Sequence, residues 1–504
     1  MTSRGPIISK TLFLRAHECP RLFWHEVHRP DLIPPLDDAE QARIQNGRLV
    51  GELARRAFPG GVMIEPGPDD DKRTAEAMAD PGVNVIYEAT FRTPGEVGRA
   101  DVLRRAPDGS WDLIEVKASS RVKDEHKLDV AFQLRLLLKN GVQVHDVLLA
   151  HPDPDYVRED VIDPKSFFTL NSLRVEAEAL QADVERDLVR FHQILASPTP
   201  PPETGFERCK CPFHVRAQTP HPIDQLPFLS QKARTKLIEA NITDITQIPA
   251  DFNGLSERQM RVRDAVVNGA PYFDHETLAR EFANFVYPIH FIDFETFQPP
   301  IPMYRGTRPF QTVPFQWSLH SLGIDGSIKH AEFLHTEETV PFRAFGESLL
   351  DALGDVGTVV VYSSHEREIL KSLIPSAPDL RDEILAVIDR QVDLLKLVRA
   401  NVYYPEFHGS YSLKKILSVL VPDLGYDDLA IRNGAHAAAI FEELLREGMR
   451  NGLADERCQA LLAYCCRDTE ALLRIYQALH HEIQRRRSML IVPRKPAHAG
   501  GRRR

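Results

Sequence analysis

The proline-rich stretch SPTPPPETG at residues 197–205 is the feature that most limits how this chain can fold. Proline fixes its own backbone angle and lacks an amide hydrogen, so no helix or central strand continues through such a stretch. The 504 residues therefore divide into segments that must each build a core. We expect four parts: a domain at 1–215, a helical connector at 216–285, a domain at 286–484 and a basic, flexible tail at 485–504.

Composition narrows the class of protein. The chain is 43% hydrophobic and 27% charged, as in ordinary globular proteins, which excludes disordered and fibrous classes. No apolar run approaches the about 18 residues of a membrane span, and polar residues interrupt the N-terminus before a secretory core could form. We therefore expect a cytoplasmic protein without a membrane partner. A net charge of −10 excludes a uniformly basic nucleic-acid coat, but not a nuclease, which gathers carboxylates for metal ions.

Periodicity predicts a mixed α/β fold. A helical pattern runs from about Asn171 to Leu195, and short amphipathic segments at 221–285 predict the helical connector. The segment VYPIHFIDFETF at 286–297 is rich in β-branched and aromatic residues and predicts a strand. Further strands (QWSLHSLGI, GTVVVYSS) and helices at 434–447 and 455–481 follow it, which indicates an α/β domain.

Residues 97–117, VGRADVLRRAPDGSWDLIEVK, predict a β-hairpin around the turn formers of APDGS. A loop centred on Asp108 places Asp101 opposite Glu115, with both side chains on one face. Lys117 lies two residues after Glu115 and so shares that face, where its ammonium could orient a water beside a metal held by the carboxylates. The alternative is an exposed hairpin with surface ion pairs.

The surroundings of this hairpin add a resemblance. The segment LIEVKAS is followed by a helix, DVAFQLRLLLKNG, that contains Gln133. Over about residues 7–215 the chain resembles the RecB-type PD-(D/E)XK nucleases, whose fold is restriction-endonuclease-like. The resemblance assigns Asp101 as the acidic residue, Glu115 to Lys117 as E-x-K, Gln133 as the following glutamine, and Asp101 and Glu115 as metal ligands. Where many of these nucleases have a histidine, this chain has Gly51, with Glu52 adjacent.

Cysteines lie near both ends of this expected domain. Six cysteines in the whole chain, two of them adjacent, do not form the pattern of a disulfide framework. RecB-type nucleases with an iron–sulfur cluster hold it with one early cysteine and a late group. By that resemblance the cluster ligands are Cys19, Cys209 and Cys211, with His214 as the fourth. The same set also resembles a Cys₃His zinc site, and isolated thiols are the remaining alternative.

A second set of acidic residues lies in the C-terminal half. In FIDFET, Asp293 and Glu295 are two residues apart on a predicted strand, so both carboxylates project from one face. In LLAYCCRDTEALLRIY, Tyr464 and Asp468 are four residues apart and share one face of a predicted helix. Such carboxylates can hold two Mg²⁺ or Mn²⁺ ions about 4 Å apart for phosphodiester hydrolysis, with the tyrosine positioning the attacking water.

The order of these segments resembles the DEDD (DnaQ-like, RNase H-like) 3′–5′ exonucleases of the tyrosine subclass. The resemblance assigns three metal ligands and one water-positioning residue: Asp293, Glu295 and Asp468, with Tyr464. The second motif departs from the family pattern, because the strand VVVYSS leads into His365 and Glu366. Glu366 must then supply the fourth carboxylate, with Asp393 as the reserve candidate. The turn GSYSLKKIL places Lys414 and Lys415 at a helix start, where they could hold a phosphate.

The whole chain resembles a bacterial family that joins a RecB-like nuclease to a DnaQ-like exonuclease, matching also in CPRLFWHEVHRP and GYDDLAIRNGAHA. The connector resembles a helix-hairpin-helix element. The resemblance implies a metal-dependent nuclease with two active sites of different design, acting on DNA more than RNA. Two alternatives remain: a nucleic-acid-binding or scaffold protein with degenerate sites, and an exonuclease that acts on RNA.

Overall fold

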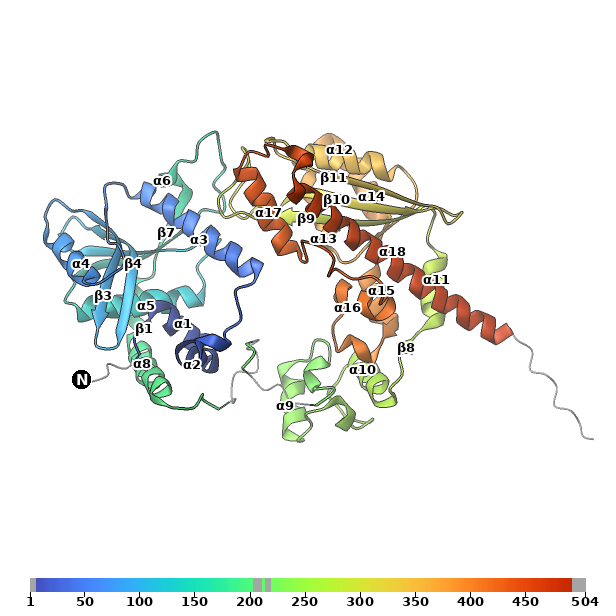
Figure 1. Ribbon diagram of the computed structural model, residues 1–504, viewed down its shortest axis with the longest axis horizontal. Helices are drawn as coiled ribbons and strands as arrows, with labels where there is room; N and C mark the ends of the chain where they lie inside the picture. Colours follow the sequence, from blue (N-terminus) through green and yellow to red (C-terminus); the bar gives the residue numbers. More distant parts are fainter. Residues whose placement is uncertain (1–5, 203–210, 214–218, 492–504) are drawn as a thin grey trace, which may run out of the picture. The chain divides into compact units, whose positions relative to one another are not determined.

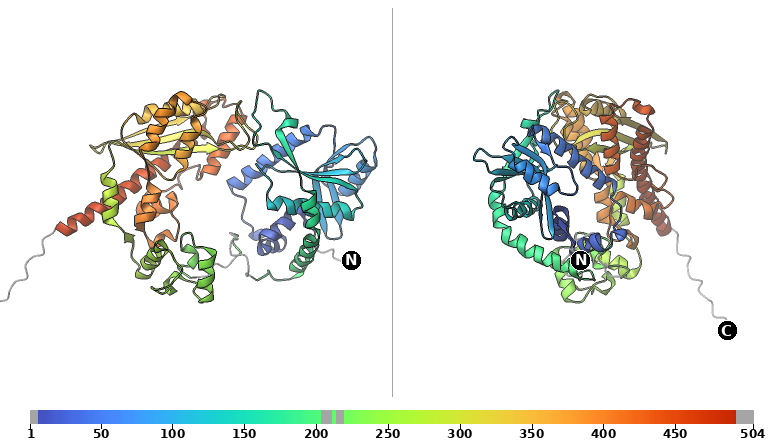
Figure 2. Two further views of the ribbon diagram at one scale, coloured as in Figure 1. Left: turned by 180° about the vertical axis from the view of Figure 1, so that it is seen from behind. Right: turned by 60° about the vertical axis from the view of Figure 1, so that its left-hand side comes forward.

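The computed structural model describes residues 6–202, 211–213 and 219–491 (Figure 1). The chain forms two compact units. The first comprises Met1–Val215 together with Gln298–Gln311, and the second comprises Arg216–Phe297 and Thr312–Arg504. Each unit combines a β-sheet with helices, so the chain is a mixed α/β protein (Figure 2). The segment expected as a separate connector belongs to the second unit.

A mixed sheet of seven strands forms the centre of the first unit. Its order is β2 (Val62–Met63), β3 (Val85–Thr93), β4 (Glu96–Arg105), β5 (Trp111–Val116), β6 (Val144–Pro152) and β7 (Phe168–Ser172), with β1 (Ile8–Ser9) beside β4. The predicted hairpin is β4–β5. It pairs Val102 with Ile114 and Arg105 with Trp111, which is the register that a loop centred on Asp108 requires. The predicted register is therefore confirmed.

Strand β5 is buried on both faces, because two hydrophobic clusters enclose it. Leu113 packs into the larger cluster, and Ile114, on the opposite face, packs into a smaller one with Val102. In the larger cluster, Phe132 of α5 stacks on Phe13 of α1 with ring centroids 4.8 Å apart. Glu115 has the same strand parity as Leu113, so its carboxylate is directed toward α5.

The helices of the first unit are α1 (Lys10–Glu18), α2 (Pro20–His28), α3 (Asp38–Ala57), α4 (Asp70–Ala79), α5 (Asp124–Lys139), α6 (Pro164–Phe167), α7 (Arg174–Ala179) and α8 (Gln181–Ala196). The helix expected from about Asn171 to Leu195 is in fact the end of β7 followed by α7 and α8. Leu180 separates the two helices, and Asn171 pairs with Leu149 in the sheet.

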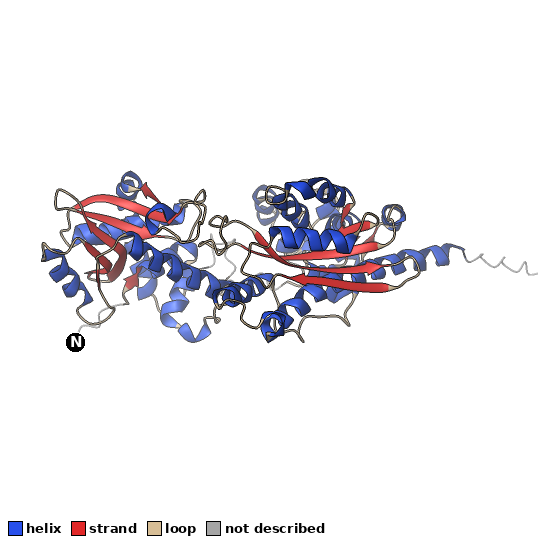
Figure 3. Cartoon of the chain, turned by 90° about the horizontal axis from the view of Figure 1, so that it is seen from above, coloured by secondary structure: helices blue, strands red, loops and turns tan. Residues whose placement is uncertain are grey.

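The sheet of the second unit has the order β11 (Ile328–Leu334), β10 (Val313–Leu322), β9 (Ile289–Phe297), β12 (Thr358–Val361) and β13 (Gln391–Asp393). Strand β9 is antiparallel to β10 and parallel to β12. Helices cover both faces (Figure 3). Neighbouring residues of β10 show this, because Gln316 donates to Leu461 of α18 and Trp317 donates to Ser348 of α12. The acid-bearing strand is thus central and covered.

The remaining helices of this unit are α9 (Gln231–Glu239), α10 (Glu257–Asn268), α11 (His275–Ala283), α12 (Phe342–Leu353), α13 (His365–Leu373), α14 (Arg381–Asp389), α15 (Leu394–Asn401), α16 (Leu413–Leu420), α17 (Gly434–Arg446) and α18 (Glu456–Ile491). A short ribbon joins β8 (Tyr272–Phe273) to β14 (Val402–Tyr403). Part of the expected flexible tail is helical, because α18 continues to Ile491. Residues 492–504 lie outside the described residues.

Among the helices that the structure describes, none has the length and apolarity needed to cross a membrane.

The packing of α5 against α1 generates a stability prediction. We expect Phe132→Ala to lower the free energy of unfolding of the first unit by about 3–5 kcal/mol, because a fully buried ring is replaced by a cavity. Urea denaturation followed by the fluorescence of Trp24 and Trp111 measures this. Val189→Ala is the control, because Val189 on α8 is 60% exposed and should change stability by about 0.5 kcal/mol or less. Equal effects of the two substitutions would contradict this account of the core.

Candidate active sites

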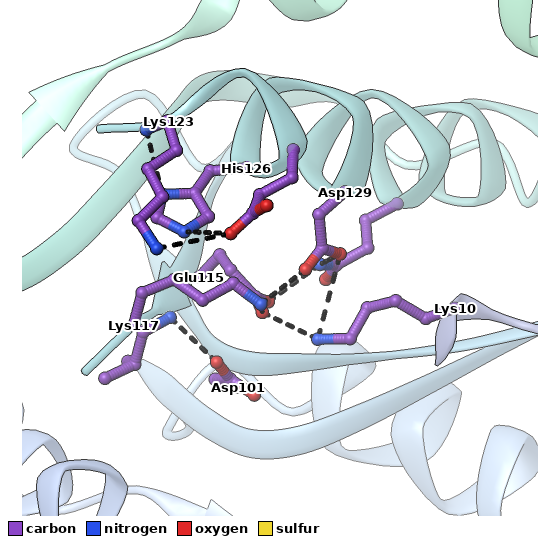
Figure 4. Close-up of polar contacts among 10 residues, drawn as sticks. Lys10, Asp101, Glu115, Lys117, Lys123, His126 and Asp129 are labelled. Atoms are coloured by element: carbon purple, nitrogen blue, oxygen red, sulfur yellow. Dashed lines mark hydrogen bonds and ion pairs between the residues drawn. The ribbon is translucent and has the colours of Figure 1, made fainter. Parts of the chain in front are cut away.

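Glu115 is the centre of the candidate site in the first unit (Figure 4). Its side chain is 1% exposed, and both carboxylate oxygens accept hydrogen bonds or ion pairs. Oε1 lies 2.7 Å from Lys10 Nζ and 2.8 Å from Lys117 Nζ, and Oε2 accepts from Gln133 Nε2 at 2.7 Å. The structure thus brings together three of the predicted residues, Glu115, Lys117 and Gln133.

Asp129 and Lys10 complete this cluster, and the sequence analysis missed both. Asp129 is fully buried on α5, 2.5 Å from Lys117 Nζ and 3.9 Å from Lys10 Nζ. Gln133 Nε2 also donates to Asp129 at 2.8 Å. The spacing of four residues between Asp129 and Gln133 is a signal that could have identified Asp129. Lys10 offers no such signal, since only the tertiary structure brings it to β5.

Asp101 lies beside Glu115 and accepts a hydrogen bond from the backbone amide of Val116 at 2.7 Å. Burial and the neighbouring Glu115 carboxylate raise the pKa of Asp101 to about 7. Burial opposes ionisation of Glu115 as well, but the ammonium groups of Lys10 and Lys117 hold its pKa well below the usual range. The two carboxylates therefore differ in protonation near neutral pH, as interacting acids do when one of them is paired with cations.

The donor set of this site fits a divalent cation only in part. Asp101 and Glu115 are hard oxygen donors suited to Mg²⁺ or Mn²⁺. The ammonium group of Lys10, however, already forms an ion pair with Glu115, so a metal cation has to compete with Lys10 for this carboxylate. The position of the usual histidine adds no ligand, because a Cβ atom built at Gly51 has nothing within 4 Å and Glu52 is exposed. A cleft of about 600 Å³ reaches the cluster and is lined by Lys10, Lys117 and Asp129 among others.

The predicted cysteine set is described in part. Cys19 caps α2, and its Sγ lies 3.5 Å from Cys211 Sγ. Arg21 and His25 of α2 also contact Phe213, so residues 211–213 lie against this helix. Cys209 and His214 lie outside the described residues. The sulfur–sulfur distance is close to the about 3.8 Å expected for two thiolates on one tetrahedral zinc ion with bonds of about 2.3 Å.

In the second unit, Asp293 and Glu295 come together with Asp468 and Tyr464 from α18. The alternation of β9 directs both acids toward α18, while Ile292 and Phe294 are buried on the other face. Burial raises the pKa of Asp293 well above its usual value, and the charges of Asp468 and Glu295 raise it further. These influences place the three carboxylates close together, and local spacing alone had predicted only the pairs Asp293 with Glu295 and Tyr464 with Asp468. Tyr464 hydrogen-bonds to Asp468.

Glu366 contributes charge to this cluster, and the charge of Asp393 acts in turn on Glu366. Strands β9 and β12 are parallel, so their carboxyl ends meet at one edge, and Glu366 follows β12 in the first turn of α13. The charge of Glu366 contributes to the raised pKa of Asp293. Glu366 is 3% exposed, and its Oε2 atom has no hydrogen-bond partner among the described residues. Asp393 itself caps α15 by accepting from the amide of Lys396 at 3.0 Å.

Three further side chains border the carboxylates. Tyr426 donates a short hydrogen bond to Asp468, and it lies in the segment GYDDLAIRNGAHA. Lys414 Nζ lies 4.5 Å from the ring centroid of Tyr426 and 5.3 Å from that of Tyr464. Cys465 Sγ lies 3.8 Å from Asp293 Oδ2. The sequence analysis proposed a phosphate contact for Lys414 but assigned no role to Tyr426 or Cys465.

The electrostatics of this site fit a divalent cation. Burial, together with Asp468, raises the pKa of Glu295 to about 8, and burial, together with Asp393, raises that of Glu366 to about 7. Burying several carboxylates in one cluster is costly unless a cation or protons compensate them. Ligand atoms of Asp293, Glu295 and Cys465 lie within 4.8 Å of one another. Mg²⁺ and Mn²⁺ prefer oxygen to sulfur, so the carboxylates and not the Cys465 thiol are the natural ligands for these ions.

Comparisons with known proteins add little to this description. A family model described as "Domain of unknown function (DUF2779)" matches residues 290–412, a span that includes Asp293, Glu295 and Glu366. No curated protein matches the chain. The solved structure titled "Crystal structure of SSO0001" is similar at 15% identity, covering 42% of this chain and 88% of that chain, with a TM-score of 0.22. A similarity with that TM-score carries no argument about fold or function.

The raised pKa values predict a specific dependence of stability on pH. In the absence of metal, the folded protein holds protons on Glu295 and Glu366 that the unfolded chain releases, so stability should fall as pH rises from about 4.5 to about 8. Added Mn²⁺ or Mg²⁺ should reverse much of this loss at high pH. Thermal denaturation in EDTA across this range, with and without added metal, measures both effects.

The double variant Glu295→Gln/Glu366→Gln is the control for this measurement. Amides do not titrate, so the variant should lose less stability than wild type as pH rises, and added metal should stabilise it less. Identical pH and metal responses of the two proteins would show that these carboxylates do not carry the effect.

Proposed function

We propose that this protein is a metal-dependent nuclease that hydrolyses phosphodiester bonds of DNA, acting from ends. The observation that carries the proposal is the buried cluster of Asp293, Glu295, Glu366 and Asp468, in which burial and mutual repulsion raise pKa values. We infer a DnaQ-like, RNase H-like fold for the second unit and a RecB-like PD-(D/E)XK fold for the first. Membership in the bacterial family that joins the two follows from the same resemblance.

At the second site, Asp293, Glu295, Glu366 and Asp468 would hold Mg²⁺ or Mn²⁺. Such ions act as Lewis acids on the scissile phosphate and lower the pKa of bound water. Tyr464 lies beside the carboxylates with its phenol protonated, because burial and Asp468 raise its pKa far above neutrality. It can therefore position the attacking water through a hydrogen bond. Lys414 borders the same carboxylates and can neutralise charge on the substrate phosphate.

At the first site, Asp101 and Glu115 would hold one such ion. Burial opposes the charge of Lys117, but Glu115 and Asp129 keep its pKa above the usual value, so its ammonium stays protonated. A fixed positive charge beside the metal can orient the water and stabilise the phosphorane charge. Gln133 holds Glu115 in position through its hydrogen bond. The set of Cys19, Cys209, Cys211 and His214 would hold zinc or an iron–sulfur cluster.

Two observations favour a second candidate function for the first unit. The Lys10 ammonium is paired with Glu115, and Gly51 has no side chain that could bind a metal, which together suit a site that has lost activity and retains only a binding or scaffold role. An RNA substrate is the other alternative. DNA as the partner and the cytoplasm as the location remain proposals.

The second unit should carry exonuclease activity that depends on its carboxylates. We expect Asp293→Asn and Asp468→Asn to lower the rate by more than about 100-fold, because they remove metal ligands, and Tyr464→Phe to lower it by about 10- to 100-fold. Hydrolysis of 3′- and 5′-labelled single- and double-stranded DNA and RNA, with Mg²⁺, Mn²⁺ or EDTA, measures the activity and its substrate. Wild-type rates in all carboxylate variants would support the binding-protein alternative.

Glu366 and Asp393 provide a matched pair within this experiment. Glu366→Gln should be as damaging as Asp293→Asn, and Glu366→Asp should retain activity. Asp393→Asn should remain active, since an asparagine also caps a helix. An inactive Asp393→Asn variant beside an active Glu366→Gln variant would reverse the assignment of the fourth carboxylate.

The first site is best tested with the second one disabled. In the Asp293→Asn background, we expect residual nuclease activity that Glu115→Gln or Lys117→Ala abolishes, because both change groups at the metal. Lys127→Ala is the matched control, since Lys127 lies on α5 but pairs with the exposed Asp124. Residual activity that survives both substitutions, or no residual activity at all, would show that the first site is not catalytic.

A further inference from the structure

A second cluster of potential metal-binding side chains lies between α18 and the strands β10 and β11. It consists of His320 on β10, His330 on β11 and Cys466 on α18. One ligand atom from each of these residues lies within 4.8 Å of the other two. The carboxylates of the candidate active site do not belong to this group. We infer that His320, His330 and Cys466 bind a transition-metal ion of the zinc type.

The chemistry of the donors supports this inference. Imidazole nitrogen and thiolate sulfur favour Zn²⁺, whereas Mg²⁺ and Ca²⁺ favour oxygen. Ligand atoms on a tetrahedral zinc ion lie about 3.3–3.8 Å apart, so the three side chains need to close by about 1 Å. His330 lies on the edge strand β11 with its side chain 30% exposed, which leaves it room for that adjustment.

Glu332 can supply the fourth ligand. Its Oε2 atom lies 3.8 Å from Nε2 of the His330 ring, on which Nδ1 is the nitrogen left free for a metal, and its charge acts on the Cys466 thiol. Its partial exposure gives an ion access from solvent. Binding converts the Cys466 thiol to a thiolate and releases one proton to solvent, so that two neutral imidazoles, a thiolate and a carboxylate together neutralise a divalent ion.

A buried hydrogen-bond network holds the two imidazoles in a fixed orientation. His320 Nδ1 lies 2.8 Å from Thr469 Oγ1, and His330 Nε2 lies 3.0 Å from Ser318 Oγ. Ser318 and Thr469 also contact each other, and Thr469 donates to the carbonyl of Cys466. If each histidine donates to its hydroxyl, every donor is satisfied and each imidazole keeps one free lone pair. Metal-binding histidines are oriented in this way by hydrogen bonds to their second nitrogen.

The ligands come from two strands and one helix, so a bound ion would tie edge strand β11 to α18. Since α18 also carries Tyr464 and Asp468, this ion would stabilise the helix that completes the candidate active site.

Zinc binding to the full-length chain tests this inference. Chelator-treated protein is incubated with Zn²⁺ in the presence of excess Mg²⁺, freed of unbound metal, and analysed for zinc per chain. We expect His320→Asn, His330→Asn and Cys466→Ser each to lose one zinc ion relative to wild type. We also expect zinc to raise the melting temperature of wild type more than that of Cys466→Ser.

Two controls separate this site from the others. Cys458→Ser changes a buried cysteine on the same helix, and Asp293→Asn changes the carboxylate site, and both should retain the zinc content of wild type. Zinc bound by Cys19 and Cys211 is common to all these proteins and cancels in the comparison. Wild-type zinc content in the three site variants, or no zinc on wild type, would overturn the inference. His330→Asn changes an edge residue, so it remains informative if His320→Asn does not fold.

Discussion

Buried carboxylate charge is the constraint on which both units of this protein depend. An ionised acid in a low-dielectric interior is unstable unless a cation, a proton or a set of hydrogen bonds compensates it. The first unit compensates Glu115 and Asp129 internally, with Lys10, Lys117 and Gln133. The second unit gathers four acids, with the charge of Lys414 acting on Glu295 and Asp468, and burial with mutual repulsion still raises their pKa values.

This difference separates the two sites chemically. In the first unit two ammonium groups already pair with Glu115 and Asp129, and the raised pKa values of Asp101 and Asp129 reduce the negative charge further, so a divalent cation gains less there unless it displaces Lys10. The carboxylates of the second unit carry negative charge that neighbouring lysines and arginines do not fully neutralise, and a divalent cation can neutralise it. Of the two, the second site therefore has the stronger case for catalysis, and the first has the stronger case for a degenerate site with a binding or scaffold role.

Helix α18 carries residues of both candidate metal sites of the second unit. Tyr464, Cys465 and Asp468 meet the carboxylates of β9, whereas Cys466 and Thr469 face the histidines of β10 and β11. Oxygen donors on one side and nitrogen and sulfur donors on the other would sort hard and borderline metal ions into neighbouring sites. The adjacent cysteines of the sequence thus have separate environments.

Local patterns determined much of this protein before any tertiary structure was considered. Turn residues around Asp108 and strand alternation were sufficient to pair β4 with β5 and to place Lys117 beside Glu115, because these geometries depend only on neighbouring residues. Alternation likewise placed Asp293 with Glu295, and helical spacing placed Tyr464 with Asp468. Only the tertiary structure decided which distant groups complete each cluster. Lys10 reaches Glu115 across 105 positions of sequence, and the parallel pairing of β9 with β12 brings the start of α13, with Glu366, to the carboxyl end of β9. Long-range contacts of this kind arise from packing of whole elements, which no local periodicity encodes.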